Sequence, residues 1–150
     1  KTGELKPEAL RCIDQAIPFP LVFELHHEGN VKSIAAYKRP SEADAAKSVI
    51  STYFATDWLP EGTPRQPLPV VFDLEALYAQ LLAPLLPYPP RQGESLHAQV
   101  DRMDQIGQLQ RELERCEARL AKEKQFNRKV AMNAERREIR MRLEWLVAIN

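Results

Sequence analysis

The chain has 150 residues, 44% of them hydrophobic and 28% charged, and its 21 basic residues balance its 21 acidic ones. This length can bury one modest core, and a net charge of zero gives the whole molecule no attraction to anionic partners. No apolar run reaches the roughly 18 residues that a membrane span requires, and the first residues lack the apolar core of a signal peptide. Cys12 and Cys116 are too few for a disulfide framework, which indicates reduced thiols and a cytoplasmic location.

The first predicted element is a short helix over residues 6–17. Pro7 suits the first helical turn, and an apolar face follows from three residues at three- and four-residue steps, Leu10, Ile13 and Ile17. Pro18 and Pro20 end the helix, because proline lacks a backbone donor. The chain opens on Lys1 rather than on Met, so we expect further residues upstream of it.

Residues 20–39 predict a β-hairpin, on which the rest of the first 87 residues can pack. Apolar and polar side chains alternate on both sides of a turn at Glu28-Gly29-Asn30, and this period of two is typical of paired strands. Residues 48–56 are rich in β-branched and aromatic side chains and predict a third strand. Because apolar groups fall on both of its faces, we expect this strand to be covered on both sides.

Four prolines between residues 60 and 69 predict an extended loop. After the loop, residues 70–72 are compatible with a short strand, and Asp73 suits the N-cap of a helix over residues 74–82. Prolines recur between residues 84 and 90, which indicates that the first domain ends there.

From residue 94 onward the chain contains no proline and has the pattern of long helices. Apolar residues recur at the spacing of heptad core positions, and they form a seam of Ile106, Leu109, Leu113, Cys116 and Leu120. The seam breaks at Glu123 and resumes over residues 139–146. We therefore predict two antiparallel helices with a turn between residues 125 and 133, the second helix being capped by Asn133. One long helix that pairs with another protein is the alternative.

These elements predict an α+β fold in three parts. Residues 1–87 form an α+β domain in which helices flank a small antiparallel sheet of three or four strands, and residues 88–93 form a proline-rich linker. Residues 94–150 form a helical hairpin or a coiled-coil arm. On this arm we predict a partner-binding stripe, Leu109, Leu113, Leu120 and Leu146. A basic stretch predicts nucleic-acid-binding residues, Arg128, Lys129, Arg136, Arg137 and Arg140. An ordinary charged helix surface is the plainer interpretation of that stretch.

The histidines do not predict a metal site. His26 and His27 are neighbours on a strand and point to opposite faces, so they cannot readily share one metal with His97 on a distant helix. The sequence also contains no glycine-rich phosphate loop, nucleophile elbow or Cys-x-x-Cys pair. We assign no catalytic residue, no metal ligand and no cofactor.

An incomplete nuclease pattern lies on the predicted strands. Restriction-type nucleases follow a helix with antiparallel strands that carry two acids and a lysine, which hold Mg²⁺ and assist the attacking water. Glu24 is a candidate for the first acid and Lys38 for the lysine, but the position of the second acid is Ala36. One carboxylate would hold the metal poorly. The plainer interpretation places Glu24 and Lys38 on the solvent face, as a candidate cross-strand pair.

Five segments carry a family resemblance over nearly the whole chain: KTGEL, LRCIDQAIPFPLVFEL, VKSIAAYKRPSEAD, FATDWLP and KEKQFNRKVAMNAE. Together they resemble a bacterial family of uncharacterised proteins, the domain of unknown function 4391 family. The resemblance implies a further N-terminal region of some tens of residues. It also implies a genomic setting beside helicases and DNA methyltransferases in restriction-like and antiphage defence loci. It carries over no catalytic residue.

The resulting hypothesis is a non-catalytic accessory or scaffolding subunit of a bacterial DNA-defence or restriction-like complex. Its arm would dock a helicase, nuclease or methyltransferase through the leucine stripe, and its basic residues are candidates for a contact with DNA. Two alternatives stay open. One is a degenerate or incomplete restriction-type, metal-dependent nuclease whose missing acids lie upstream, and the other is a self-associating coiled-coil protein. We expect no membrane partner, and we keep a homo-oligomer as a further candidate.

Overall fold

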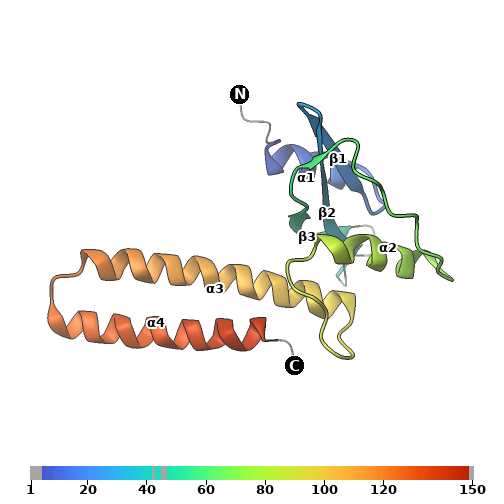
Figure 1. Cartoon of the computed structure of the whole chain (residues 1–150). Coiled ribbons are helices and arrows are strands. Elements are labelled where there is room, and N and C mark those ends of the chain that lie inside the picture. Colours follow the sequence, from blue (N-terminus) through green and yellow to red (C-terminus); the bar gives the residue numbers. More distant parts are fainter. Residues whose placement is uncertain (1–4, 42, 45–46, 149–150) are drawn as a thin grey trace. The chain divides into compact units, whose positions relative to one another are not determined.

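The structure is a computed structural model that describes residues 5–41, 43–44 and 47–148 (Figure 1). The chain divides into two compact units, Lys1–Pro87 and Tyr88–Asn150. Among the described residues, the first unit contains an antiparallel sheet with two α-helices and the second contains two long α-helices, which confirms the predicted α+β class. Within the described residues of both units, no helix has the length and apolar character needed to cross a membrane.

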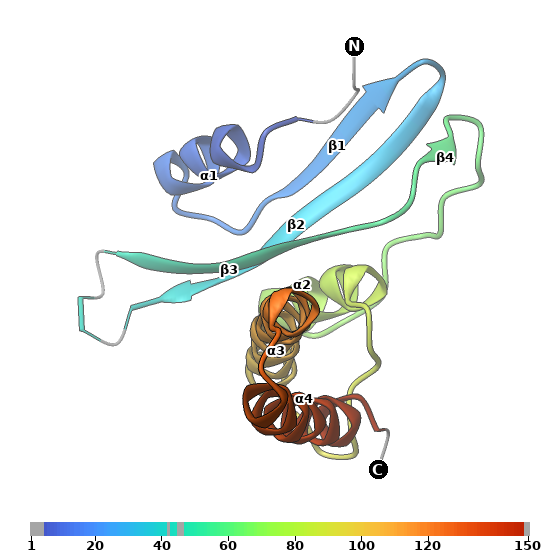
Figure 2. The ribbon, with the colours of Figure 1, turned by 90° about the vertical axis from the view of Figure 1, so that its left-hand side faces the viewer.

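The sheet of the first unit is a ribbon built on one long central strand (Figure 2). β2 (Asn30–Pro40) pairs with β1 (Val22–His27) along one edge. Along its other edge it pairs with β3 (Ser48–Ala55) and with the short β4 (Leu59–Pro60). The turn between β1 and β2 is Glu28-Gly29, in which φ is positive at both residues, 47° and 73°. This backbone conformation matches the natural twist of two antiparallel strands, so the predicted hairpin closes without strain on its pairing.

Figure 2 shows α1 (Pro7–Ala16) and α2 (Leu74–Leu82) on opposite sides of this ribbon. In α1, Leu10 is buried as predicted, but Ile13 is 46% exposed and the side chain that turns inward is Asp14. The buried face of α1 is therefore partly polar. The reason is a lysine of β2 that draws Asp14 toward the sheet, as described below.

α2 begins at the predicted N-cap, where Asp73 Oδ1 accepts a hydrogen bond from the backbone of Ala76 at 2.7 Å. A short 3-10 helix, η1 (Ala83–Leu85), continues α2. The short strand predicted over residues 70–72 is absent, and the side chains of Val70 and Phe72 are fully exposed. Prolines at positions 67 and 69 lack the backbone donors that a strand ladder needs, which disfavours pairing of this stretch.

The second unit is a hairpin of two helices that lie side by side (Figure 1). α3 (Leu96–Lys122) begins at Ser95, whose Oγ accepts a hydrogen bond from Ala98 N at 3.2 Å. α4 (Phe126–Val147) runs back along α3 after a turn of residues 123–125. The hairpin is therefore the arrangement that the chain adopts, and the single long helix is not.

The turn of the hairpin comes earlier than the sequence predicted. Glu123 Oε1 accepts hydrogen bonds from the backbone nitrogens of Lys124 (2.8 Å) and Gln125 (2.9 Å), so its carboxylate binds the donors of the turn that precedes α4. Asn133 is not a cap. It lies inside α4, where its Nδ2 donates to the carbonyl of Lys129 at 2.9 Å. A side chain that bonds to the preceding turn in this way is compatible with a helix interior.

Candidate functional site

A buried lysine joins α1 to the sheet of the first unit. Lys38 Nζ lies 2.7 Å from Asp14 Oδ1, and both side chains are at most 3% exposed. The amine also donates to three backbone carbonyls at the C-terminal end of α1, those of Asp14, Ile17 (2.6 Å) and Phe19 (3.2 Å). The second carboxylate oxygen of Asp14 accepts a hydrogen bond from Tyr53 at 2.9 Å. The lysine therefore caps α1 at the end where the helix dipole favours a positive charge.

An irregularity in β2 accompanies this placement. The pairing of β2 with β3 shifts register between Ala36 and Lys38, as in a β-bulge, and bulges re-aim side chains. Tyr78 of α2 bridges the shifted backbone, because its hydroxyl donates to the carbonyl of Ala36 and accepts from Lys38 N at 2.9 Å. Its ring stacks on Tyr37, with ring centroids 6.1 Å apart. Lys38 thus links α1, the sheet and α2.

We expect the first unit to lose stability as the pH rises above 10. Burial raises the pKa of Tyr78 from 10.0 to about 12, and burial also raises the pKa of Tyr53, helped by its hydrogen bond to Asp14. A pKa raised in the folded state stabilises the fold below the unfolded pKa, and this contribution is lost as the pH climbs through the folded value. Urea midpoints at a series of alkaline pH values should show the decline, and they should decline less steeply for Tyr78→Phe. An equal slope in both proteins would contradict the assignment.

The lysine of the nuclease hypothesis is not arranged to act with Glu24. Glu24 Oε2 accepts a hydrogen bond from Arg65 at 3.0 Å on the exposed side of β1. Lys38 is 7% exposed rather than on the solvent face, and its amine donates to Asp14 and to backbone carbonyls. A lysine held in this way cannot orient a water molecule without losing those contacts.

The three histidines lie in separate surroundings. His26 Nδ1 is 2.9 Å from Glu61 Oε1, the His27 ring is 6.1 Å from the Trp58 ring, and His97 Nδ1 is 3.6 Å from Asp101. Within the described residues, no three side chains of His, Cys, Asp and Glu gather in a way that would hold a metal ion. The three histidines therefore contact acidic or aromatic side chains near them and do not converge on one site.

The four leucines predicted to bind a partner lie in the seam where α3 meets α4. Leu109 and Leu146 are buried at 6% exposure each, and Leu113 and Leu120 are half-buried. They share this seam with three further buried residues, Ile106, Cys116 and Ile139. Most of the leucine surface is thus already used inside the hairpin, and a partner has to contact other residues or only the edges of these.

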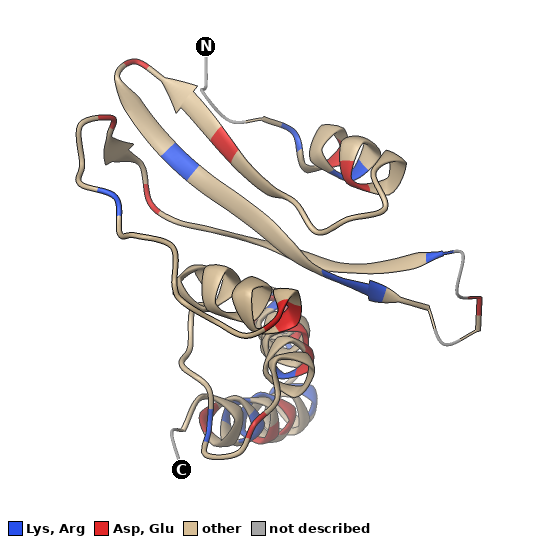
Figure 3. Ribbon diagram, turned by 90° about the vertical axis from the view of Figure 1, so that its right-hand side faces the viewer, with Lys and Arg blue, Asp and Glu red and all other residues tan. Residues whose placement is uncertain are grey.

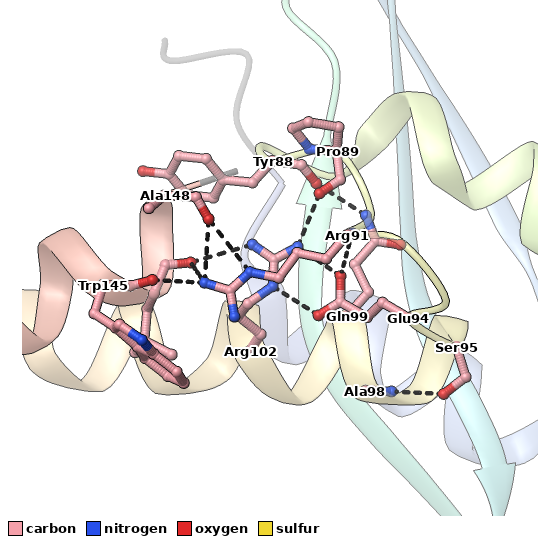
Figure 4. Close-up of polar contacts among 11 residues, drawn as sticks. Tyr88, Pro89, Arg91, Glu94, Ser95, Ala98, Gln99, Arg102, Trp145 and Ala148 are labelled. Atoms are coloured by element: carbon pink, nitrogen blue, oxygen red, sulfur yellow. Dashed lines mark hydrogen bonds and ion pairs between the residues drawn. The ribbon is translucent and has the colours of Figure 1, made fainter. Parts of the chain in front are cut away.

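A pair of arginines holds the open end of the hairpin (Figure 4). Arg102 and Glu94 form a bidentate pair, with Nε–Oε1 and Nη2–Oε2 distances of 2.7 and 2.8 Å. Arg102 also donates to the carbonyls of Pro89 (2.8 Å) and Leu146 (3.3 Å). The hydrogen bond from Arg102 is the main reason why the pKa of Glu94 falls below its usual value. Pro89, in the predicted linker of residues 88–93, is therefore hydrogen-bonded to α3. Residues 88–93 belong to the second unit.

Arg91 completes this arginine clasp, which we define as Arg91, Glu94 and Arg102. Its Nη2 donates to the carbonyls of Trp145 (2.6 Å) and Leu146 (3.1 Å), and its guanidinium lies 5.0 Å from the centre of the Trp145 ring. Two positive groups thus satisfy the last carbonyls of α4, where the helix dipole favours cations. The clasp keeps the ends of α3 and α4 together and fixes the position of Trp145.

A groove runs along one side of the hairpin between the two helices. Its first part, about 470 Å³ in volume, is lined by four apolar residues of both helices, Leu109, Met141, Trp145 and Leu146, and by polar or charged side chains at its edges, among them Gln105, Glu138 and Arg142. Its second part, about 750 Å³, is lined mainly by charged residues, among them Arg115, Arg119, Lys122 and Glu135. Glu112 lines both parts, so the two parts adjoin at this residue. Met141 and Trp145 are four residues apart on one helix face and are 62% and 63% exposed.

The predicted nucleic-acid-binding residues are not all free. Arg140 forms a 2.7 Å ion pair with Glu117, and Arg128 lies 3.8 Å from Glu123. Arg137 Nε donates to the carbonyl of Asn133, Arg136 is half-buried, and Lys129 is exposed. Figure 3 shows basic and acidic residues interleaved along α3 and α4. The structure therefore does not gather the five predicted cations into one unpaired patch.

The sequence was compared with protein families, with curated proteins and with solved structures. Residues 1–143 match the sequence model of a family described as a domain of unknown function (DUF4391). The chain belongs to the DUF4391 family. This match confirms the family that the five segments resembled, and it spans the sheet unit and most of the hairpin. No curated protein and no solved structure matches the chain.

Two exposed apolar features of this DUF4391 chain were missed by sequence reasoning. One is the pair Met141 and Trp145 beside the groove. The other is a set of alternate residues that ends on the first residue of α2 and is 71–107% exposed, Leu68, Val70, Phe72 and Leu74. Their period of two is visible in the sequence, but the predicted elements divide them among a loop at Leu68, a short strand over residues 70–72 and a helix from Leu74. Large apolar groups left in water commonly mark an interaction surface.

Proposed function

We propose that this protein is a non-catalytic accessory subunit of a bacterial DNA-defence or restriction-like complex, whose hairpin binds a helix of a helicase, nuclease or methyltransferase. The observation that carries the proposal is the groove between α3 and α4, with its two adjoining parts. Two antiparallel helices with such a groove resemble a helical bundle from which one helix is absent. An amphipathic helix that lies in a groove is a recurring mode of protein recognition.

The groove favours a particular kind of helix. Met141 and Trp145 offer an apolar end, and tryptophan is among the residues that contribute most to binding energy at interfaces. The other end carries three cations, Arg115, Arg119 and Lys122, against two carboxylates, Glu112 and Glu135, and is net positive. We therefore propose a partner helix with large apolar residues toward one end and acidic residues toward the other.

The surroundings of the candidate catalytic residues support the non-catalytic part of the proposal. Lys38 is surrounded by Asp14 and backbone carbonyls, and Glu24 is paired with Arg65. Neither side chain presents a free group to a substrate. The basic residues of α4 remain candidates for a contact with DNA, and Lys129 is exposed, whereas Arg128 and Arg140 lie beside acidic side chains.

Removing the apolar end of the groove should release the partner. In affinity purification of the tagged full-length protein from its native host, we expect Trp145→Ala and Met141→Asp to reduce the co-purified DNA-processing partner roughly 10- to 100-fold. This range corresponds to the loss of about 1.5–3 kcal/mol of binding energy at a central contact. Circular dichroism should show that both variants retain their helix content.

Phe19→Ala is the control, because Phe19 is an exposed aromatic residue that lines neither part of the groove. It should leave the amount of partner unchanged. Retention of the partner by both groove variants would refute docking at the groove. A protein purified alone, with a mass of two chains by light scattering, would instead place a second copy in the groove.

A further inference from the structure

The closed end of the hairpin concentrates positive charge. We define the hairpin tip as the turn and its flanking residues, Lys122, Glu123, Lys124, Phe126, Arg128 and Lys129. The amines of Lys122, Lys124 and Lys129 form no ion pair within the described residues, and all three side chains are exposed. The tip therefore carries three unpaired cations within eight residues, in a molecule whose net charge is zero.

The single carboxylate of the tip does not neutralise these lysines. Glu123 Oε1 accepts hydrogen bonds from the two backbone nitrogens that follow it in the turn, and its second oxygen is 3.8 Å from Arg128. These hydrogen bonds lower the pKa of Glu123 below its usual value, and the one from Gln125 has the larger effect. The acid is thus used to shape the turn, and the lysines face solvent.

An aromatic side chain lies among these cations. Phe126 is the first residue of α4 and is 77% exposed, and Val130, one turn later, is 51% exposed. The ring takes no part in the seam of the hairpin, so the fold does not account for a large apolar group in this position. Lys124 precedes it and Arg128 follows it, each at a distance of two residues.

We propose that the hairpin tip binds single-stranded nucleic acid, with the Phe126 ring stacked on an unpaired base and Lys122, Lys124 and Lys129 on the neighbouring phosphates. This inference rests on the proposed contact with DNA and specifies its ligand. Aromatic rings beside cations are the combination that single-strand-binding proteins use. In a duplex the bases are stacked on one another, so a duplex would contact the lysines but not the Phe126 ring. One phenylalanine and one valine offer too little apolar area for an interfacial membrane helix.

The test is a binding titration of the full chain by fluorescence anisotropy. The probes are labelled oligothymidine and oligouridine of roughly 20 nucleotides, and a duplex of the same length. We expect both single strands to bind more tightly than the duplex. A comparison of oligothymidine with oligouridine shows whether the tip prefers DNA or RNA. Phe126→Ala should weaken single-strand binding roughly 5- to 100-fold, the loss of one base–aromatic stack. Phe126→Tyr should retain binding, and Phe126→Leu should not.

The lysines are tested by the dependence on salt. Lys124→Glu with Lys129→Glu should lower the affinity and reduce the slope of log affinity against log salt by about 1.4, or about 0.7 for each phosphate contact to a single strand. Lys6→Glu with Arg111→Glu, which changes the total charge equally away from the tip, is the matched control and should change the slope little.

Three results would overturn the inference. Equal binding by Phe126→Ala and the unmodified protein would reduce the tip to a phosphate contact without stacking. Binding to anionic lipid vesicles that depends on Phe126, without binding to nucleic acid, would assign the tip to a membrane surface. No binding to any probe would exclude both the stacking and the proposed contact of the isolated protein with DNA. The groove proposal would be untouched, because it is measured separately by partner recovery.

Discussion

Replacing Lys38 by methionine is expected to destabilise the first unit by about 3–5 kcal/mol, the usual cost of removing one partner of a buried ion pair. Methionine has a similar volume, so the loss does not come from a cavity. Instead, the carboxylate of Asp14 stays in a site that is 1% exposed, with Tyr53 as its remaining side-chain donor. The carbonyls at the end of α1 also lose the amine that they share. Urea unfolding followed by tryptophan fluorescence in a Trp145→Phe background measures the effect, because Trp58 is then the single tryptophan.

Two further variants separate the charge effect from general damage. Lys47→Met removes a lysine that also pairs with an acid, Asp44 at 3.2 Å, but whose side chain is 79% exposed, so we expect a loss below about 1 kcal/mol. Asp14→Leu combined with Lys38→Met should recover much of the stability, because no charge is then left buried. A Lys38→Met protein that unfolds at the same urea concentration as the unmodified chain would show that the pair does not hold α1.

Arg102→Met is the second substitution with a large expected effect, and it should destabilise the hairpin by about 3–5 kcal/mol. The side chains of Arg102 and Glu94 are 5% and 10% exposed, so the carboxylate would lose its bidentate partner in a largely dry site. The carbonyls of Pro89 and Leu146 would lose a donor as well. Urea unfolding in a Trp58→Phe background reports this loss directly, because Trp145 then provides the fluorescence and lies against the clasp.

The control for the clasp is an ion pair of the same length at the surface. Arg119 and Glu135 are also 2.7 Å apart, but their side chains are 56% and 47% exposed, so Arg119→Met should have a much smaller effect. Equal losses for Arg119→Met and Arg102→Met would mean that burial of the clasp is not what matters.

The clasp also predicts sensitivity to acid. Its hydrogen bond to Arg102 lowers the pKa of Glu94 below the unfolded value of 4.5. A lowered pKa stabilises the fold above the unfolded value, and this contribution is lost as the pH falls through the folded value. The urea midpoint of the hairpin should therefore decline below pH 4.5. In Glu94→Gln the midpoint should start lower at neutral pH and change less with acid. A decline of the same steepness in Glu94→Gln would assign the acid sensitivity to other carboxylates.

Much of the local structure could be predicted from the residues because its causes are local. The alternation around Glu28-Gly29 predicted the first hairpin, and the β-branched residues of 48–56 predicted β3. Asp73 was correctly assigned as an N-cap, since a cap needs only its own side chain and a backbone nitrogen three residues away. The helical pattern after residue 94 predicted two helices, but the turn was placed too late. The hydrogen bonds from the backbone of residues 124 and 125 to Glu123, which shape the turn, are not visible in the apolar pattern.

The candidate sites depended on contacts between distant residues. Strand alternation predicted that Lys38 faces solvent, but the structure buries it. A register shift in β2 accompanies the approach of Lys38 to the carbonyls at the end of α1. These carbonyls lie 19 to 24 residues earlier in the sequence, so a local pattern could not predict the contact. The leucine stripe was correctly recognised as apolar, but whether it meets a partner or α4 depends on how the chain turns back on itself. Once α4 covers that stripe, the exposed large apolar residues of the hairpin are Phe126, Val130, Met141 and Trp145, which no periodicity singles out. Burial is a property of the whole arrangement, whereas periodicity and capping are properties of a few neighbouring residues.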